Sequence, residues 1–493
     1  MTKIAGPGSF EAARAVDGQS GPTELPRRGP ISKTVAGGLL ALSDGLGTFA
    51  AGVAPAVAQG AVGQLGNWTV TILSSLCGMA LVTGALYLGK GYRFGTLRRL
   101  QHSVVPALGA WLLLAVFALA VGASGARSLH EPPATIEWLI GALAVLLAGR
   151  GVLAHLMAQW AQAGRLTQRI AIVGASEVGE RLIRRLDELD DVDLVGLYDD
   201  RVRRIAGVCG GRAVRGTTDD LLTDARLRRI DTIMVALPLV ADRRISGLVA
   251  KLRQLPVTVT LCPEWFDLSA GQCGLESLGG MPVLRAADRP MRDWRELVKD
   301  IEDRVLGAII LALIAPVLAA IAIAIKLDSP GPVFFRQKRY GYNNELIEVF
   351  KFRSMYHHTR DVNAEQLTRR GDPRITRVGR YIRRASLDEL PQFINVVRGE
   401  MSIVGPRPHA LSAKAAGILY PDAVQDYHSR HRVKPGITGW AQVNGWRGET
   451  DTIEQIAKRV EHDLYYIEHW SLTLDLKIIL RTIVSGFTGS HAF

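Results

Sequence analysis

The chain has 493 residues, enough for several domains, and 48% of them are hydrophobic, a share that is high for a purely soluble protein. Its formal net charge of +12 would suit nucleic acid, but in a membrane protein it suits anionic headgroups and phosphorylated substrates. We therefore expect no nucleic-acid partner. The four cysteines show no CxxC spacing, which argues against a disulfide framework or a zinc site.

Four long apolar runs occupy the first third of the chain. They cover roughly residues 34–58, 67–89, 103–123 and 135–157. Each run is long enough to cross a hydrocarbon core, which takes ~20 residues. A signal peptide would place its apolar stretch nearer the start, so residues 1–33 are predicted to be an uncleaved, disordered cytosolic tail. Residues 34–157 are predicted to form four transmembrane helices.

The basic residues of the short connections predict the orientation of this bundle, because Lys and Arg stay on the cytoplasmic side. The tail is basic, and so is the second connection, with Lys90, Arg93, Arg98 and Arg99. The first connection is uncharged, and Arg127 is the only Lys or Arg in the third. Both ends of the bundle are therefore expected to face the cytoplasm.

A Rossmann-like α/β domain is predicted over residues 166–270. Arg169–Val173 is typical of a short buried strand, Gly174–Gly179 opens a helical stretch, and the next apolar strand ends at Asp199. This order resembles the first half of a dinucleotide-binding fold, with an acid ~20 residues beyond the glycines. Ser176 replaces the glycine that lets backbone approach a pyrophosphate. We interpret the domain as structural or regulatory, with a bound nucleotide as the alternative.

A fifth apolar run, Val305–Ile325, contains Pro316 close to its middle. Basic residues lie on both sides of it, namely Arg295, Lys299, Arg304, Lys326, Arg336, Lys338 and Arg339. Both flanks favour the cytoplasm, and a helix that enters and leaves on one side satisfies both. Proline lacks the amide donor and clashes with the preceding turn, so Pro316 is predicted to break the helix. The prediction is a re-entrant helix over residues 305–325, with a kinked spanning helix as the alternative.

The segment after this run is strongly cationic. From Arg336 to Arg384 there are thirteen Lys or Arg residues against five Asp or Glu residues. A solvated basic face at the membrane surface is one interpretation. Several cations lie instead within mixed segments, namely Lys351–Met355, Asp372–Thr376 and Gly379–Arg383. Arg suits bidentate phosphate contacts and Lys suits point-charge neutralisation, and a diphosphate substrate needs several such groups.

Two adjacent carboxylates, Asp388 and Glu389, follow this cationic segment. Ser386 with Glu389 three residues later fits a capping box at a helix start. Pro391 argues against that interpretation, because it would fall in the second turn, whereas proline prefers the first helical position. The carboxylates would then lie just ahead of the helix. A carboxylate can attack phosphorus to form an acyl-phosphate, and its neighbour can hold Mg²⁺ against donor phosphates.

Two loops further along the chain carry a cation each. Gly399–Pro408 places Arg407 between two prolines, a rigid mount for a guanidinium, and the glycine-rich segment Lys434–Gly445 adds a cation and an aromatic. Loops of this kind usually make turns. Their recurrence within one cationic region favours a functional interpretation.

Four segments together resemble the bacterial sugar transferase family, the polyprenyl-phosphate hexose-1-phosphate transferases. They are Lys351–Met355, Ser386–Gln392, Val404–Pro408 and Lys434–Gly445, in the family's order and spacing. The resemblance covers roughly Asp300–Phe493, and long-form members also carry four upstream spans and an α/β module. It implies an α-rich catalytic domain over residues 295–493 with a re-entrant helix.

The resemblance also implies the reaction. Hexose-1-phosphate would pass from a UDP-sugar to undecaprenyl phosphate with release of UMP, by a ping-pong mechanism with Mg²⁺. Asp388 would be the nucleophile and Glu389 would assist metal binding or activation. The expected phosphate-binding residues are Lys351, Arg353, Arg383, Arg407 and Lys434.

The setting implied is the first membrane step of exopolysaccharide synthesis. Such an enzyme is a multi-pass protein of the bacterial inner membrane with a cytoplasmic catalytic domain. Gly445–Thr452 and Asp463–Ile467 look like members that use UDP-glucose, while relatives that use UDP-galactose share nearly all catalytic motifs. For oligomeric state we expect a homodimer through the membrane or α/β region.

Two other classes of function compete with this one. A membrane-anchored NAD-dependent sugar-nucleotide enzyme would use Gly174–Gly179, but Ser176 interrupts that fingerprint and no Tyr is followed four residues later by Lys. A scaffold for polysaccharide assembly would tolerate loss of either carboxylate, and the intact segments around Asp388 and Arg407 argue against it.

Three ionisable residues lie outside these motifs. Asp44 lies within the first apolar run, where an ionisable group is costly and often functional, and it is expected to pair inside the bundle or lie near an interface. His428 and His431 are spaced for one helix face, yet no cluster of Cys, His or carboxylate residues accompanies them. We interpret them as phosphate or solvent contacts.

Overall fold

The computed structural model describes most of the chain. The described residues are 32–58, 65–97, 100–123, 132–189, 191–201, 208–228, 230–237, 242–262, 276–278, 281–357, 372–424, 426–446, 448 and 452–488. The predicted tail, residues 1–33, lies almost entirely outside this part of the chain. The chain divides into two compact units, Pro22–Thr167 and the remainder, and each is described by itself.

The first unit is a bundle of apolar helices. Its long helices are α2 (Lys33–Ala58), α3 (Leu65–Leu88), α5 (Leu100–Ala123) and α6 (Pro132–Gln162), and the one-turn helix α4 (Phe94–Leu97) lies between α3 and α5. The long helices coincide with the four apolar runs of the sequence. Within a bilayer a helix pairs every backbone polar group internally, which is why such runs become helices. The described residues contain five helices long and apolar enough to cross a membrane, these four and α10 of the second unit.

A buried ion pair joins two helices of the bundle. Arg150 of α6 donates from Nη1 to both carboxylate oxygens of Asp44 on α2, at 3.1 Å each, and neither side chain is exposed. A charge inside a membrane is tolerated where it faces the bundle interior and finds a partner. The expectation that Asp44 pairs inside the bundle is confirmed.

The α/β domain is built on a sheet with the strand order β3-β4-β2-β1-β5-β6-β8-β7 in the described part of the chain. The strands are β1 (Gln168–Val173), β2 (Val192–Tyr198), β3 (Val208–Cys209), β4 (Arg212–Gly216), β5 (Thr232–Val235), β6 (Thr258–Leu261), β7 (Glu276–Leu278) and β8 (Met281–Ala287). The central run β4-β2-β1-β5-β6 is parallel and has the order of a dinucleotide-binding fold. The predicted Rossmann-like domain is confirmed. Its sheet continues past residue 270, because β8 adds antiparallel to β6.

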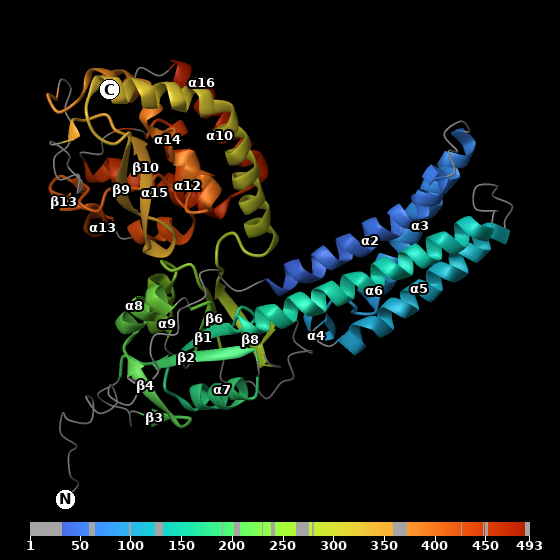
Figure 1. Ribbon diagram of the computed structural model, residues 1–493. Coiled ribbons are helices and arrows are strands. Elements are labelled where there is room, and N and C mark those ends of the chain that lie inside the picture. The colour runs from blue at the N-terminus through green and yellow to red at the C-terminus, as the bar shows by residue number, and fades with distance from the viewer. Residues whose placement is uncertain are drawn as a thin grey trace, which may run out of the picture. The chain divides into compact units, whose positions relative to one another are not determined.

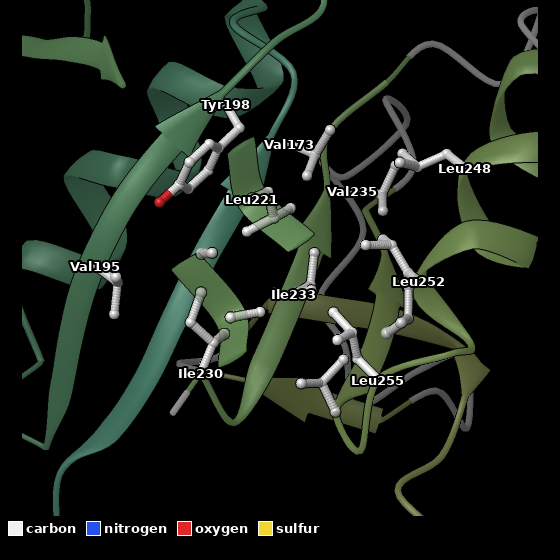
Figure 2. Close-up of a cluster of buried hydrophobic side chains, with 14 of the residues drawn as sticks. Val173, Val195, Tyr198, Leu221, Ile230, Ile233, Val235, Leu248, Leu252 and Leu255 are labelled. Atoms are coloured by element: carbon white, nitrogen blue, oxygen red, sulfur yellow. The ribbon is translucent and has the colours of Figure 1, made fainter. Parts of the chain in front are cut away.

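Helices cover both faces of this sheet. They are α7 (Glu177–Asp187), α8 (Thr218–Arg228) and α9 (Asp242–Leu252). α7 covers one face, where Leu182 packs in the same buried cluster as Ile170. α8 and α9 cover the other face, and Figure 2 shows Leu221 of α8 near Ile233 and Leu248 of α9 near Val235 of the sheet. Alternate residues of each strand therefore pack into two separate cores, as a parallel sheet between helix layers requires.

The catalytic-domain region is rich in short elements around three longer helices and a hairpin. In chain order they are α10 (Trp294–Asp328), β9 (Phe334–Tyr340), η5 (Tyr342–Asn344), β10 (Leu346–Phe352), α11 (Arg377–Arg384), η7 (Leu387–Glu389), α12 (Gln392–Arg398), β11 (Ser402–Val404), β12 (Lys414–Ala415), β13 (Ile418–Leu419), α13 (Tyr420–Ala423), η8 (Tyr427–Arg432), β14 (Gly436–Thr438), α14 (Trp440–Val443), α15 (Ile453–Glu468) and α16 (Leu472–Thr488). Its main core joins β10, α12, β11 and α15 through Val349, Val396, Val404 and Tyr466. This core fixes the elements that carry the site.

Helix α10 has a polar start and an apolar remainder. Asp303 accepts hydrogen bonds from the Ile403 amide at 2.9 Å and from Ser402 Oγ at 3.0 Å, and Lys299 Nζ lies 2.5 Å from a carboxylate oxygen of Asp475. These contacts hold its first turns to the domain. The helix continues through Pro316, and Figure 1 shows that it changes direction along its length.

The rest of α10 exposes a continuous apolar surface. Its exposed large side chains include Val305, Ile309, Leu313, Val317, Ile323 and Leu327. An apolar surface of this extent marks a contact with a membrane or a partner. The polar contacts of its first turns and the exposed apolar side chains along the rest agree with a helix that enters the bilayer.

Candidate active site

Asp388 and Glu389 lie in a single 3-10 turn, η7, between α11 and α12. Pro391 is the N-terminal cap residue of α12, so both carboxylates precede that helix, as the proline predicted. Ser386 makes no capping hydrogen bond from its side chain, and the capping box does not form. Ser386 instead adopts a left-handed backbone with φ of 54°. Non-glycine residues are held in this conformation mainly where the surrounding structure requires it, which is common at functional sites.

Glu389 is clamped by two cations. Arg407 donates from Nη1 to Oε2 at 3.0 Å and from Nη2 to Oε1 at 2.6 Å, and Lys351 Nζ donates to Oε1 at 2.9 Å. This is the two-pronged contact that a guanidinium makes with a carboxylate. Burial by itself would raise the pKa of Glu389, but Arg407 and Lys351 hold it well below its usual range. Glu389 is therefore ionised and fixed in place.

Asp388 has the opposite environment. Burial raises the pKa of Asp388, the charge of Glu389 adds to this effect, and Lys351, Arg383 and Arg407 oppose it. No residue in the described part of the chain donates a hydrogen bond to its carboxylate. A desolvated carboxylate without hydrogen-bond donors is a better nucleophile than a solvated one. The two adjacent acids are thus separated into one fixed anion and one available carboxylate.

The cations around the pair come from three elements. Lys351 lies on β10, Arg383 on the last turn of α11, and Arg407 on the loop after β11. Helix α11 lies directly against the Lys351 segment, because a Cβ on Gly379 would come 2.0 Å from the carbonyl oxygen of Ser354. That close approach needs glycine, and it directs the end of α11 to Asp388. The charge of Arg383 acts on Asp388 accordingly.

A buried arginine positions the Arg407 loop. Arg430, which is 1% exposed, donates from Nη2 to the carbonyl oxygen of Arg407 at 2.7 Å and to Asp463 Oδ2 at 2.6 Å. Sequence reasoning missed Arg430, because nothing in the spacing of η8 and α15 indicates that the two elements meet here. The charge and hydrogen bonds of this pair fix the backbone from which Arg407 reaches Glu389.

Arg353 does not point to the carboxylate pair. It is 1% exposed, and its guanidinium donates to the carbonyl oxygens of Pro330 at 2.6 Å and Ser329 at 2.7 Å, with a longer bond to Ile325. These carbonyls belong to the last turn of α10 and the two residues after it, where a cation stabilises the end of a helix. The structure therefore assigns Arg353 to the membrane helix and speaks against the predicted phosphate contact.

The substitution Arg353→Met is expected to lower the free energy of unfolding by about 3 kcal/mol, because it removes the guanidinium that donates to the carbonyl oxygens of Ser329 and Pro330. Thermal or urea denaturation of the detergent-solubilised protein measures this. Arg383→Met serves as a control, since Arg383 is half-buried at the edge of the site, and it should reduce turnover with little change in stability. Loss of turnover in Arg353→Met at unchanged stability would restore the phosphate role.

Three other predicted residues occupy distinct positions. Lys434 pairs with Asp300 of α10 at 2.6 Å and lines a cavity of about 90 Å³ beside Arg432 and Tyr342. No described contact joins it to the carboxylates. His428 and His431 both contact Asn344 through its side-chain oxygen and are neutral, since burial lowers the pKa of each. His431 is buried, which excludes a solvent contact for it, whereas His428 is partly exposed. A phosphate contact of either residue stays a prediction.

The fit of a metal ion depends on the two acids. Among the described residues there is no group of three or more His, Cys, Asp or Glu side chains arranged to hold a metal. Mg²⁺ typically needs only one or two carboxylates when substrate phosphates supply the rest of its ligands. Arg407 and Lys351 leave one lone-pair position on Glu389 Oε2, and Asp388 lies beside it. The residues fit an ion that arrives with a diphosphate, and they do not fit one held by protein alone.

The glycine-rich turn of the α/β domain is occupied by contacts within the domain. Ser176 caps α7 by accepting from the Gly179 amide at 3.2 Å, and its hydroxyl donates to the carbonyl oxygen of Ala236 at 2.8 Å. Asp199 accepts from the Ala175 amide at 2.9 Å and pairs with Arg201 at 2.8 Å. The groups that would meet a pyrophosphate and a ribose are therefore engaged, which favours the structural or regulatory interpretation.

Comparison with known proteins agrees with this geometry. The sequence profile of the bacterial sugar transferase family matches residues 294–489, and that of a CoA-binding domain matches residues 89–263. The UDP-glucose:undecaprenyl-phosphate glucose-1-phosphate transferase of Escherichia coli is 44% identical over 66% of this chain and 68% of its own length. The protein of the same name from Xanthomonas campestris pv. campestris is 35% identical over 84% of this chain and 91% of its own length.

A third relative matches a shorter part of this chain. The UDP-N-acetylgalactosamine-undecaprenyl-phosphate N-acetylgalactosaminephosphotransferase of Aeromonas hydrophila is 43% identical over 38% of this chain and 43% of its own length. The two longer matches each cover more of this chain than the sugar transferase profile does. The chain therefore belongs to the bacterial sugar transferase family and is a phosphotransferase.

Proposed function

We propose that this enzyme transfers glucose-1-phosphate from UDP-glucose to undecaprenyl phosphate, releasing UMP, as the first membrane step of exopolysaccharide synthesis. The observation that carries the proposal is the contrast within the acid pair. Glu389 is clamped by Arg407 and Lys351, while Asp388 beside it receives no hydrogen bond from the described residues. A site built only to bind anions would not need a partly buried carboxylate in that state.

The reaction proceeds in two displacements. A carboxylate oxygen of Asp388 attacks the phosphorus that bears the sugar, the bond from that phosphorus to the bridging oxygen breaks, and UMP leaves with the electron pair. A phosphate oxygen of undecaprenyl phosphate then attacks the same phosphorus and releases the Asp388 carboxylate. Splitting one transfer into two steps is the advantage of a covalent intermediate.

The cations stabilise the charge that builds up during both displacements. Arg383 lies on the Asp388 side of the pair, Arg407 pairs with Glu389, and the charge of Lys351 acts on both acids, so the transferred phosphoryl group would lie between positive charges. Preorganised cations of this kind are usually the largest single contribution to phosphoryl transfer. Mg²⁺, when bound with the donor, would be held by Glu389 and Asp388 and would neutralise diphosphate charge.

Glucose is the favoured sugar because the two relatives with the longer matches are named for UDP-glucose. The relative named for N-acetylgalactosamine matches a shorter part of this chain at a similar identity. Sequence identity at this level therefore supports the chemistry without setting the sugar. UDP-galactose remains the alternative donor with the same mechanism.

We place the catalytic domain on the cytoplasmic face of the bacterial inner membrane, with α10 re-entering on the side it left. Support comes from the polar first turns of α10, which are tied to Ser402 and Asp475, and from its exposed apolar remainder. Basic residues at both flanks favour the same side. A helix that spanned the membrane would separate the carboxylates from cytoplasmic nucleotide-sugars.

Release of UMP by purified enzyme tests the function. UDP-glucose should be turned over when undecaprenyl phosphate is present, and UDP-galactose should be turned over at least tenfold more slowly. Faster turnover of UDP-galactose would change the donor and keep the mechanism. Stoichiometric binding of NAD without any UMP release would favour the NAD-dependent alternative.

The pH profile should identify the acid that must be ionised. Burial raises the pKa of Asp388 above 3.8, while Arg407 and Lys351 hold that of Glu389 well below 4.5 although burial opposes them. Because the ionised Asp388 is the active form, kcat/KM is full above its pKa and falls as the pH drops through it. The acidic limb of kcat/KM is therefore expected above 3.8, and a limb at or below that value would exclude Asp388 as its origin.

A further inference from the structure

The hairpin of β9 and β10 carries a cation that the mechanism above does not use. The two strands are antiparallel, and Arg339 lies opposite Ile347, Gln337 opposite Val349, and Phe335 opposite Lys351. Residues directly opposite each other in a sheet share a face, and so do residues two apart along a strand. Arg339 therefore lies on the same face as Lys351, the residue that contacts Glu389.

This face is the inner one. Val349 is 1% exposed and Gln337 is 6% exposed, whereas the neighbouring residues Arg336 and Lys338 on the opposite face are exposed. Charged residues alternate with this period when only one face of a hairpin meets solvent. Arg339 is thus the cation of β9 that the fold turns inward.

Two segments of the site meet at Arg339. Its backbone forms an isolated antiparallel bridge with Ala410, three residues after Arg407. The loop that carries Arg407 therefore lies against the hairpin at Arg339. The charge of Arg339 acts on Arg407 and Glu389, and burial, together with the charge of Arg407, lowers its pKa to about 10, so it stays a cation at neutral pH.

The described partner of Arg339 is neutral. Its Nη2 donates to Gln337 Oε1 at 2.6 Å, and no Asp or Glu in the described part of the chain forms an ion pair with it. Arg407 and Lys351, by contrast, both pair with Glu389. Counting Lys351, Arg383, Arg407 and Arg339 against Asp388 and Glu389, four positive charges face two negative ones. A partly buried excess of positive charge favours binding of an anion.

We propose that Arg339 binds the phosphate of the leaving UMP, an assignment that rests on the proposed function. In an in-line displacement the leaving group lies opposite the nucleophile. The charges that act on Arg339 are those of Arg407 and Glu389, and Arg339 is not among the cations that act on Asp388, so it lies on the Glu389 side of the acid pair. It is four residues along the hairpin from the position opposite Lys351, about 13 Å of strand. Its guanidinium is suited to grip the phosphate that departs, while Arg383 and Lys351 hold the one that stays.

Direct binding of UMP and uridine to the purified full-length enzyme tests this assignment without turnover. Arg339→Gln should weaken UMP binding about tenfold to a hundredfold, the range expected for a charge-assisted contact, and leave uridine binding unchanged. Arg339→Lys keeps the positive charge but loses the two-pronged contact of a guanidinium, so it should weaken UMP binding by a smaller factor. Lys338→Gln is the matched control, since Lys338 is the next residue on the exposed face and should bind UMP like the native enzyme.

The native affinity for UMP and the ratio between variants answer different questions. Failure of the native enzyme to bind UMP would contradict the proposed function itself. Native binding that Arg339→Gln leaves intact would overturn the assignment of Arg339 alone. An equal loss for UMP and uridine would also overturn it, because that result indicates a general distortion of the hairpin.

Discussion

Replacing Asp388 by asparagine is expected to lower UMP release from UDP-glucose by about 10⁴-fold or more. An amide of the same size cannot form the acyl-phosphate, and removal of the nucleophile from an enzyme with covalent catalysis costs on the order of 10⁶ in turnover. The variant should fold, because Asn removes a buried charge whose pKa is already raised. Release of UMP with and without undecaprenyl phosphate measures the effect.

The matched variant for this experiment is Glu389→Gln. This variant keeps Asp388 and the size of the side chain at position 389, but it weakens the contacts with Arg407 and Lys351. Its turnover should fall less than that of Asp388→Asn, by about 10²- to 10³-fold, as for the loss of a fixed electrostatic partner. Turnover of Asp388→Asn at or near the native rate would contradict a covalent role for Asp388.

The substitution Arg407→Lys is expected to lower kcat/KM for UDP-glucose by about 10²-fold to 10³-fold. A lysine can replace the charge, yet it cannot make the two parallel bonds to Oε1 and Oε2 of Glu389. Because a lysine at this position stabilises ionised Glu389 less than Arg407 does, the pKa of Glu389 should rise from its lowered value. Arg407 also lowers the pKa of Asp388, so the looser lysine contact should let the pKa of Asp388 rise, and the acidic limb that Asp388 sets should move to higher pH in this variant.

Arg336→Lys is the control for Arg407→Lys. Arg336 has a 63% exposed side chain on the outer face of β9 and a distant partner in Glu348 at 3.6 Å, so its replacement should leave kcat/KM within about twofold. A native pH profile in Arg407→Lys, with unchanged kcat/KM, would show that the clamp on Glu389 does not matter for the reaction.

Much of the architecture could be predicted from patterns in the sequence. Long uncharged runs become helices because a bilayer leaves the backbone no other partner, and the glycine turn followed by an acid indicates a parallel sheet. The position of the carboxylates could also be predicted, because Pro391 cannot lie in the second turn of α12 and therefore starts that helix. In each case a local physical constraint leaves a single solution.

The direction of individual side chains could not be predicted in the same way. Arg353 and Lys351 are two residues apart on one motif, yet Lys351 reaches Glu389 while Arg353 ends at the carbonyls of α10. Residue type indicates that a cation binds oxygen, and only the fold decides which oxygen. Arg430 and Asp463 illustrate the same limit, since their pairing depends on the packing of η8 against α15.

The boundaries of α10 depend on tertiary contacts as well. Hydropathy places its start near Val305, but the helix begins at Trp294. Its first turns are charged, and they are stable because Lys299 and Asp303 find partners on α16 and β11. Those partners are far away in sequence, so the apolar pattern alone gives a shorter helix. The same anchoring supports the proposal that the polar start of α10 stays on the side of the catalytic domain.

The most direct test of the covalent mechanism is peptide mass spectrometry of the enzyme after incubation with UDP-glucose in the absence of undecaprenyl phosphate. The peptide that contains Asp388 should gain the mass of one hexose phosphate, with about one UMP released per enzyme, and addition of undecaprenyl phosphate should remove the adduct. Release of UMP only when the lipid is present, with no adduct on Asp388 at any time, would indicate direct transfer and contradict the proposed mechanism.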